Sequence, residues 1–210
     1  MRLFDELNTP SESKILPIEQ YFDEMELTET QKDKRKEFAE SIFEIALFLF
    51  SLFSVMKEYD YIKIDFISAQ LQSKYLEVAR KHNINIDSHV KAYIKKFSEE
   101  IVSTTERHID KEYFLSQDRA TIIGENEAQS IIGYSELTKA IKSGYTKKKW
   151  ITERDNKVRK THREIDGLTI NISEPFIVGD SLMMYAHDAI TFNADEKELC
   201  GCRCATKYLK

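Results

Sequence analysis

Residues 147–172 read "KKKWITERDNKVRKTHREIDGLTINI" and decide the fold of this chain, because the residue pattern changes there. "KKKWIT" is short, aromatic and β-branched, which favours a strand. The turn dipeptide Asp166-Gly167 precedes apolar residues at alternate positions, Leu168, Ile170 and Ile172. The C-terminal stretch "CRCATKY" has the same extended character. We therefore expect an α+β protein that ends in a small domain with short antiparallel strands.

The chain before this region is expected to be helical. All six glycines lie at or after Gly124, and residues 18–123 contain neither glycine nor proline. One helix should begin at Thr28, where "TETQ" fits a capping box, and Gly144 is well placed to end another. The pattern predicts helices from residue 28 through the "KEY" at 57–59, over 64–83, over 85–109 and over 116–145.

Apolar residues at helical spacing predict the buried faces of two of these helices. The first set is Phe66, Leu71, Tyr75, Val78 and Ala79, and the second is Val90, Ile94, Phe97 and Ile101. Asp87 or Ser88 should cap the second helix. We expect three parts: an extended arm over 1–20, a helical region over 21–115 and the α+β domain over 116–210.

The most apolar run, "IALFLFSLFSVM" at 45–56, has 12 residues. A membrane span needs about 20, so a buried helix without membrane contact is expected. Tertiary packing or a partner protein could cover it, and the sequence leaves that choice open.

The three cysteines, Cys200, Cys202 and Cys204, are the only ones in the chain. An odd number at alternate positions makes poor disulfides, which indicates a reducing compartment such as the cytoplasm. On a strand, Cys202 and Cys204 point to one side. If "DNKVRKTH" is helical, Asp155, Arg159 and His162 share one face. Asp155, His162, Cys202 and Cys204 would then form a candidate tetrahedral zinc site.

The same residues have a second interpretation. Cys202 and Cys204 would be small buried apolar residues of the last strand. Asp155 and Arg159 would form an ordinary ion pair, and His162 would be a hydrogen-bonded structural residue. His187 in "MMYAHDAI" is a candidate fourth ligand if Asp155 is not one, although a loop residue without a role is the interpretation that we favour from sequence.

A basic stretch lies between Thr146 and Arg163, with eight Lys or Arg residues and two acidic ones on a chain of net charge −5. The mild negative total argues against a general nucleic-acid binder, but a local patch could contact phosphates. The alternative is a solvated face beside an acidic region. The candidate nucleic-acid contacts are Lys147, Lys148, Lys149, Lys157, Lys160 and Arg163.

The order of these segments resembles the C-terminal domain of the Mu F-like phage minor head proteins, also called phage head morphogenesis proteins. The resemblance covers about residues 118–206. It includes the strand at Trp150, the Asp-Gly turn, "EPF" at 174–176 and the closing "CGCRC". The spacing of Asp155, Arg159 and His162, the loop aspartate Asp188, and the helix pattern of Arg119, Ala120, Ile123 and Glu127 are also similar to the family pattern. Gly201 departs from the asparagine that is usual in the family.

The resemblance implies a minor capsid protein of a tailed phage or prophage. It would act in head assembly near the portal, with DNA packaging or delivery as a further role. The implied partners are the portal, other head proteins and double-stranded DNA. The implied location is the virion head, and the host cytoplasm during assembly. The resemblance implies no catalytic reaction and no small-molecule substrate, and it strengthens the case for zinc at the cluster.

An alternative from another class is a small nuclease-like or toxin-type enzyme that uses His162 and the basic stretch 147–163. Cleavage of nucleic acid that depends on His162 would distinguish this alternative from an assembly protein.

Overall fold

The computed structural model describes residues 15–59, 63–192 and 194–210. Contacts divide the chain into two compact units. The helical unit contains residues 38–124, and the C-terminal unit contains residues 17–37 together with 125–210. The division falls inside two long helices, α2 (Glu29–Glu58) and α5 (Gln117–Lys142).

In the helical unit, α3 (Ile64–Lys81) and α4 (Ser88–Arg107) pack against each other, and a short 3₁₀ helix, η1 (Glu112–Leu115), follows α4. The expected face of α4 is confirmed, because Val90, Ile94, Phe97 and Ile101 are all buried. Asp87 caps this helix by accepting bonds from the backbone N–H groups of His89 and Val90, at 2.9 and 3.0 Å.

The prediction for the face of α3 was wrong at Phe66, and Val78 is only half-buried. Phe66 is 53% exposed, whereas its neighbour Ile67 is fully buried. A four-residue step connects Ile67 to Leu71, Tyr75 and Ala79, and this step keeps all four side chains on one face. Phe66 lies about 100° away around the helix axis, since each residue turns the helix by that angle.

Helix α2 begins with the capping box that the sequence predicts. The Thr28 N–H donates to Oε1 of Gln31 at 3.2 Å, and the Gln31 N–H donates to Oγ1 of Thr28 at 3.4 Å. Within the described residues, α2 is the one helix long and apolar enough to cross a membrane by length and composition alone. In the helical unit it buries Phe38, Ala39, Ile42, Ala46, Leu49, Phe50 and Phe53.

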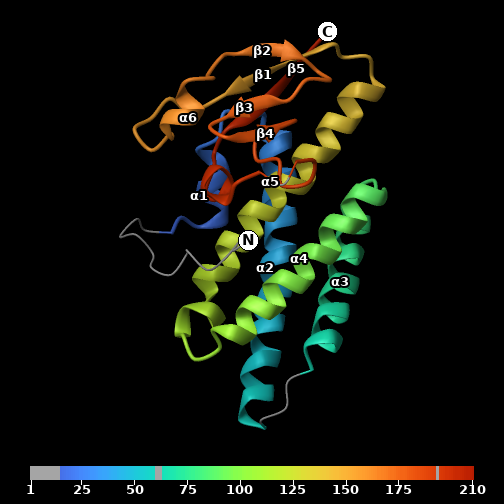
Figure 1. Cartoon of the computed structure of the whole chain (residues 1–210), viewed down its shortest axis with the longest axis vertical. Helices are drawn as coiled ribbons and strands as arrows, with labels where there is room; N and C mark the ends of the chain where they lie inside the picture. The colour runs from blue at the N-terminus through green and yellow to red at the C-terminus, as the bar shows by residue number, and fades with distance from the viewer. Residues whose placement is uncertain (1–14, 60–62, 193) are drawn as a thin grey trace. The chain divides into compact units, whose positions relative to one another are not determined.

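The C-terminal unit contains two small antiparallel sheets, which Figure 1 shows close to one another. The three-stranded sheet has the order β2 (Thr169–Asn171), β1 (Lys147–Ile151), β5 (Ala205–Leu209). In it, Trp150 pairs with Thr206. The second sheet is the hairpin of β3 (Phe176–Val178) and β4 (Ser181–Met183). These elements confirm the expected α+β class.

Short helices complete this unit: α1 (Ile18–Asp23), α6 (Lys160–Arg163) and α7 (Glu196–Leu199). Helix α1 lies partly within the segment expected to be an extended arm, and residues 1–14 of that arm are outside the described residues. Helix α5 ends as expected at Gly144, which has φ +74°. There the Tyr145 N–H bonds back to the Ala140 carbonyl at 3.1 Å.

The core of the C-terminal unit surrounds the single tryptophan. Trp150, Phe176, Val178 and Met183 are almost fully buried together with both Cys202 and Cys204. The ring of Trp150 meets that of His162 edge to face, with centroids 5.5 Å apart. The sulfur atoms therefore belong to the centre of this unit.

Candidate metal centre

His162, Cys202 and Cys204 come together, as the sequence analysis expected. Nδ1 of His162 lies 3.3 Å from Sγ of Cys204 and 3.5 Å from Sγ of Cys202. All three residues are buried, with exposures of 1, 2 and 4%. Among the described residues, these three side chains form a group that could hold a metal ion. None of the three cysteines of the chain forms a disulfide.

The chain folds so that each donor comes from a fixed element. The cysteines directly precede β5, where Tyr21 of α1 donates its hydroxyl to the Cys202 carbonyl at 2.8 Å. His162 lies on the single turn of α6. The guanidinium group of Arg159, the residue before α6, donates to the Cys200 carbonyl and so connects the two segments.

Glu198 fixes the orientation of the imidazole. Its Oε2 lies 3.0 Å from Nε2 of His162 and accepts a bond of 2.8 Å from the Thr161 hydroxyl. Since Nε2 faces this carboxylate, Nδ1 is the nitrogen left to face the thiols. A carboxylate behind a ligating histidine is the usual second shell of a zinc site. Sequence reasoning missed Glu198, because no local pattern places its carboxylate beside His162, which is 36 residues away in the sequence.

The thiols have strongly altered acidity. The hydrogen bond with Cys204 lowers the pKa of Cys202 well below its usual range, and bonds with His162 and His187 lower it further against the effect of burial. The same bond with Cys202, together with burial, raises the pKa of Cys204. Burial alone would lower the pKa of His162, but the bond and charge of Cys202 raise it. The cluster thus favours a thiolate at Cys202, and a thiolate is the form that binds metal.

Asp155 lies apart from this group. Its carboxylate contacts the guanidinium of Arg203 and accepts bonds from the backbone N–H groups of Lys157 and Val158. This local turn replaces the helix considered for 155–162, of which only α6 is helical. Asp155 therefore does not share a face with His162, and its predicted ion pair is made with Arg203 instead of Arg159.

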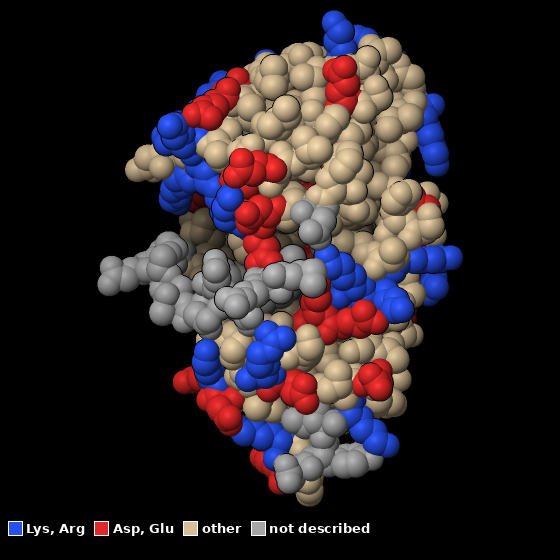
Figure 2. All heavy atoms as spheres, viewed as in Figure 1, with Lys and Arg blue, Asp and Glu red and all other residues tan. Residues whose placement is uncertain are grey.

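The structure places the candidate nucleic-acid contacts in two environments. Lys147, Lys157, Lys160 and Arg163 are exposed, and Lys149 is half-buried. Lys148 is fully buried, and its Nζ donates to the Met184 carbonyl at 2.7 Å. Burial lowers the pKa of Lys148 to about 8. Figure 2 shows Lys and Arg side chains gathered over the region of α6 with acidic side chains beside them.

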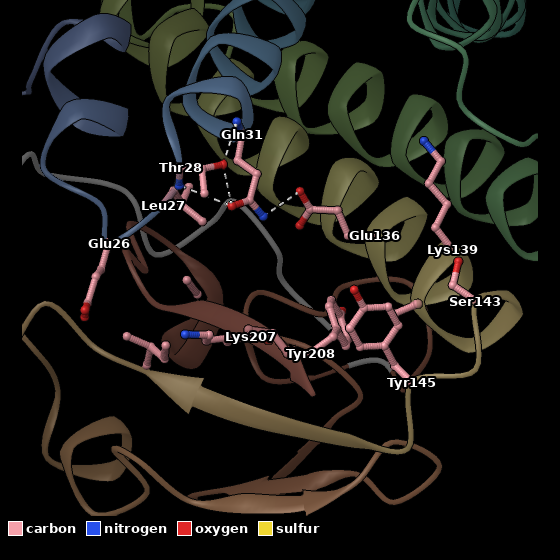
Figure 3. A pocket seen from close by; sticks show the side chains of 14 residues that line it. Glu26, Leu27, Thr28, Gln31, Glu136, Lys139, Ser143, Tyr145, Lys207 and Tyr208 are labelled. Carbon is pink, nitrogen blue, oxygen red and sulfur yellow. Dashed lines mark hydrogen bonds between the residues drawn. The ribbon is translucent and has the colours of Figure 1, made fainter. Parts of the chain in front are cut away.

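A groove in the C-terminal unit lies apart from the cluster (Figure 3). It has a volume of about 720 Å³ and is lined by the start of α2, the end of α5 and strand β5. Two of its polar side chains, Gln31 and Glu136, bond to each other. Gln31 donates to Glu136 at 3.1 Å, and Arg35 pairs with the same carboxylate at 2.8 Å. We therefore assign the site to the sulfur and imidazole cluster rather than to the groove.

The fold and the cluster define a class: an α+β domain in which a histidine and two cysteines meet at the core. Comparison with protein families gives a match to the family described as Phage Mu protein F like protein over residues 81–207. This match spans more than half of the chain, and the chain belongs to that family. Comparison with curated proteins and with solved structures gives no match.

Proposed function

We propose that this chain is a minor head protein of a tailed phage or prophage, which acts in head assembly near the portal. The family match over residues 81–207 is the observation that carries this proposal. On this proposal the portal and other head proteins are its partners. The chain would be found in the virion head, and in the host cytoplasm during assembly.

Sedimentation of procapsids tests this function. Heads assembled with the full chain should retain it through a sucrose gradient, and heads assembled from portal-free lysates should retain less. The proposal would be contradicted if heads mature normally when the chain is absent and if the chain does not sediment with heads when it is present.

The metal at the cluster is proposed to be zinc, held by His162, Cys202 and Cys204. Bonds of about 2.3 Å to sulfur and 2.0 Å to nitrogen at tetrahedral angles separate the two atoms by about 3.5 Å. The observed separations of 3.3 and 3.5 Å fit this geometry. Zinc would tie α6 to the start of β5 and so stabilise a unit whose apolar core is small.

Metal analysis of the purified chain tests the zinc proposal. We expect one zinc per chain in the wild type and loss of zinc in Cys202→Ser. The control is Cys200→Ser, because the Cys200 thiol contacts Asn126 at 3.7 Å and is not part of the cluster. A wild-type chain that is folded and free of metal would refute the proposal.

Contact with double-stranded DNA is a further part of the proposed role. The exposed basic residues Lys147, Lys157, Lys160 and Arg163 support it, whereas the buried Lys148 is left out. Acidic neighbours reduce the net positive charge of this patch. Glu164 lies 3.8 Å from Lys160, and Glu24 lies 3.9 Å from Lys157. Replacement of Lys157 and Arg163 by glutamate should weaken DNA binding and lower its salt dependence; unchanged binding would contradict the contact.

The structure offers no support for a nuclease that uses His162. This side chain is 1% exposed, and its two ring nitrogens face Glu198 and the thiols. A general base must reach the substrate that it deprotonates. We therefore propose no enzymatic function.

A further inference from the structure

Strand β5 lies at the edge of the three-stranded sheet. The strand order is β2, β1, β5, so β5 pairs with β1 and no strand of the described residues lies on its other side. An edge strand presents unpaired backbone N–H and C=O groups, and another extended chain can pair with them. The groove of about 720 Å³ lies beside this edge (Figure 3).

The groove follows the edge of β5 and not one face of the sheet. Four successive residues of the strand line it, from Ala205 to Tyr208. Successive side chains of a strand point to opposite faces, so a cavity that meets four residues in a row must lie along the edge. The start of α2 and the end of α5 form the opposite wall (Figure 3).

The backbone groups on this edge are unpaired. The N–H of Trp150 donates to the Leu168 carbonyl at 3.0 Å, and the Trp150 carbonyl accepts from Gly167 at 2.9 Å, so both groups of Trp150 point toward β2. Its partner Thr206 therefore points its own N–H and C=O away from β1, and Tyr208, two residues further, has the same orientation. Within residues 15–59, 63–192 and 194–210, these backbone groups have no hydrogen-bond partner, and the buried hydroxyl of Tyr208 has none either.

We propose that this edge is a docking site for an extended segment of another protein, which adds to β5 as a fourth strand and places an acidic side chain beside Lys139. The inference rests on the proposed head function only for the kind of protein that supplies the segment. It does not depend on the proposed zinc.

The size of the groove fits an added strand. A strand of four residues is about 13 Å long, 4.8 Å wide and 10 Å thick, so it fills about 650 Å³. The groove has about 720 Å³. The β5 strand of a second copy is flanked by its own α2 and α5, which would meet the same wall, so a free extended segment fits better than a second copy.

The charges of the groove select the chemistry of the segment. Lys139 is exposed on the wall and has no acidic partner among the described residues. Glu136 is already bonded to Arg35, at 2.8 and 3.0 Å, and Glu26 lies at the other end of the groove (Figure 3). Burial lowers the pKa of Lys34, and the neighbouring Lys139 lowers it further. Two adjacent ammonium groups without a carboxylate of their own favour an acidic side chain from the partner.

Peptide selection on the purified full chain tests the proposal. Binders are selected from a displayed library of random ten-residue peptides and are then synthesised. The selected sequences should be acidic and should lack proline at their centre, because proline cannot donate to a strand ladder. Failure to select any peptide, or selection of basic or proline-rich sequences, would overturn the docking site. The selection uses no phage heads, so its failure leaves the proposed head function standing.

The variant Tyr208→Pro removes one N–H group from the open edge and leaves the bonds to β1 in place. Its matched control is Tyr208→Ala, which also loses the ring but keeps the N–H. Loss of one or two backbone bonds should weaken peptide binding by about tenfold in the proline variant relative to the alanine variant. Equal affinities in the two variants would show that the peptide does not pair with β5. Trp150 emission checks that both variants are folded.

Hydrogen exchange gives a measurement that needs no variant. The N–H groups of Thr206 and Tyr208 should become protected when a selected peptide binds to the wild type, and a peptide that binds without protecting them would contradict strand addition. Lys139→Glu should weaken the binding of acidic peptides, whereas Lys142→Glu, which lies on α5 outside the groove, should not. Equal effects of the two charge changes would overturn the assigned acidic contact.

Sedimentation velocity of the chain alone distinguishes the other occupant. The wild type should be a monomer through this edge, and Tyr208→Pro should leave its sedimentation unchanged. A dimer that Tyr208→Pro dissociates and Tyr208→Ala retains would assign the edge to a second copy and overturn the proposal.

Discussion

The two units of this chain are stabilised in different ways. The helical unit depends on apolar side chains at regular spacing, such as the Ile67, Leu71 and Tyr75 face of α3 against α4. The C-terminal unit has strands of three to five residues and places sulfur and imidazole groups at its centre. A helix can bury a continuous apolar face, whereas very short strands cannot. Apart from the segments of α2 and α5 that it contains, the second unit has only short strands and short helices, so a metal ion at the cluster would add a further source of stability.

The largest expected effect comes from removing the cluster. Because structural zinc contributes on the order of 10 kcal/mol of binding free energy, chelation or Cys204→Ser should unfold the C-terminal unit. Trp150 is the only tryptophan and packs against His162, so its fluorescence reports on this unit alone. The emission should shift to the red, while far-UV circular dichroism retains the signal of the helical unit.

The control for this prediction is Cys200→Ser, which should leave the Trp150 emission and its unfolding midpoint unchanged. If chelation and Cys204→Ser have no more effect than this control, the C-terminal unit does not depend on its cluster. The contrast between the two units would then fail.

A core change in the helical unit should have the opposite pattern. Ile94 is fully buried on α4, and Ile94→Ala should cost about 2–5 kcal/mol of unfolding free energy. The loss is measured by circular dichroism during urea denaturation, and the zinc content should stay at one per chain. Phe66→Ala is the control, because Phe66 is 53% exposed and its loss should cost far less. A comparable loss for Phe66→Ala would contradict the corrected face of α3.

The sequence predicts the helical unit better than the candidate metal centre for a physical reason. Helical burial repeats every three to four residues, so local spacing contains the signal for Val90, Ile94, Phe97 and Ile101. The caps at Thr28 and Asp87 are local too. The miss at Phe66 shows the limit, since two adjacent apolar residues, Phe66 and Ile67, compete for one face.

The candidate metal centre joins segments that are far apart in the sequence. The spacing of Cys202 and Cys204 predicts two thiols on one side, and the structure brings His162 to them. The role of Asp155 depended on a helix over 155–162, but its carboxylate bonds to the N–H groups of its own turn. The position of Glu198 depends on tertiary packing against α6. Neither outcome can be derived from local periodicity.

Glu125 on α5 should make the stability of the C-terminal unit depend on pH. Its Oε1 is buried without a hydrogen-bond partner, and burial raises the pKa of this carboxyl from its ordinary 4.5 to about 8. The folded state therefore binds the proton more tightly than the unfolded state. The stability that this proton provides is complete below about pH 4.5 and is lost as the pH rises toward 8.

Glu125→Gln should remove this dependence and stabilise the unit by about 1–3 kcal/mol at pH 7. Urea denaturation followed by Trp150 fluorescence at pH 5 and pH 8 measures the difference between variant and wild type. Glu77→Gln, at an exposed position of α3, controls for the loss of one charge. Equal gains at both pH values, or the same gain from Glu77→Gln, would show that Glu125 is not the titrating group.

The smallest expected effect concerns the cap of α4 and tests whether a local change remains local. Asp87 satisfies two backbone N–H groups at the start of this helix, and Asp87→Ala should cost about 1 kcal/mol. Asp87→Asn keeps an acceptor oxygen and should lose only a fraction of that amount. Because α4 belongs to the helical unit, the circular dichroism midpoint should fall while zinc affinity stays unchanged. If Asp87→Ala also weakens zinc binding, the stability of the cluster depends on the helical unit, and the two regions cannot be treated as separately stabilised.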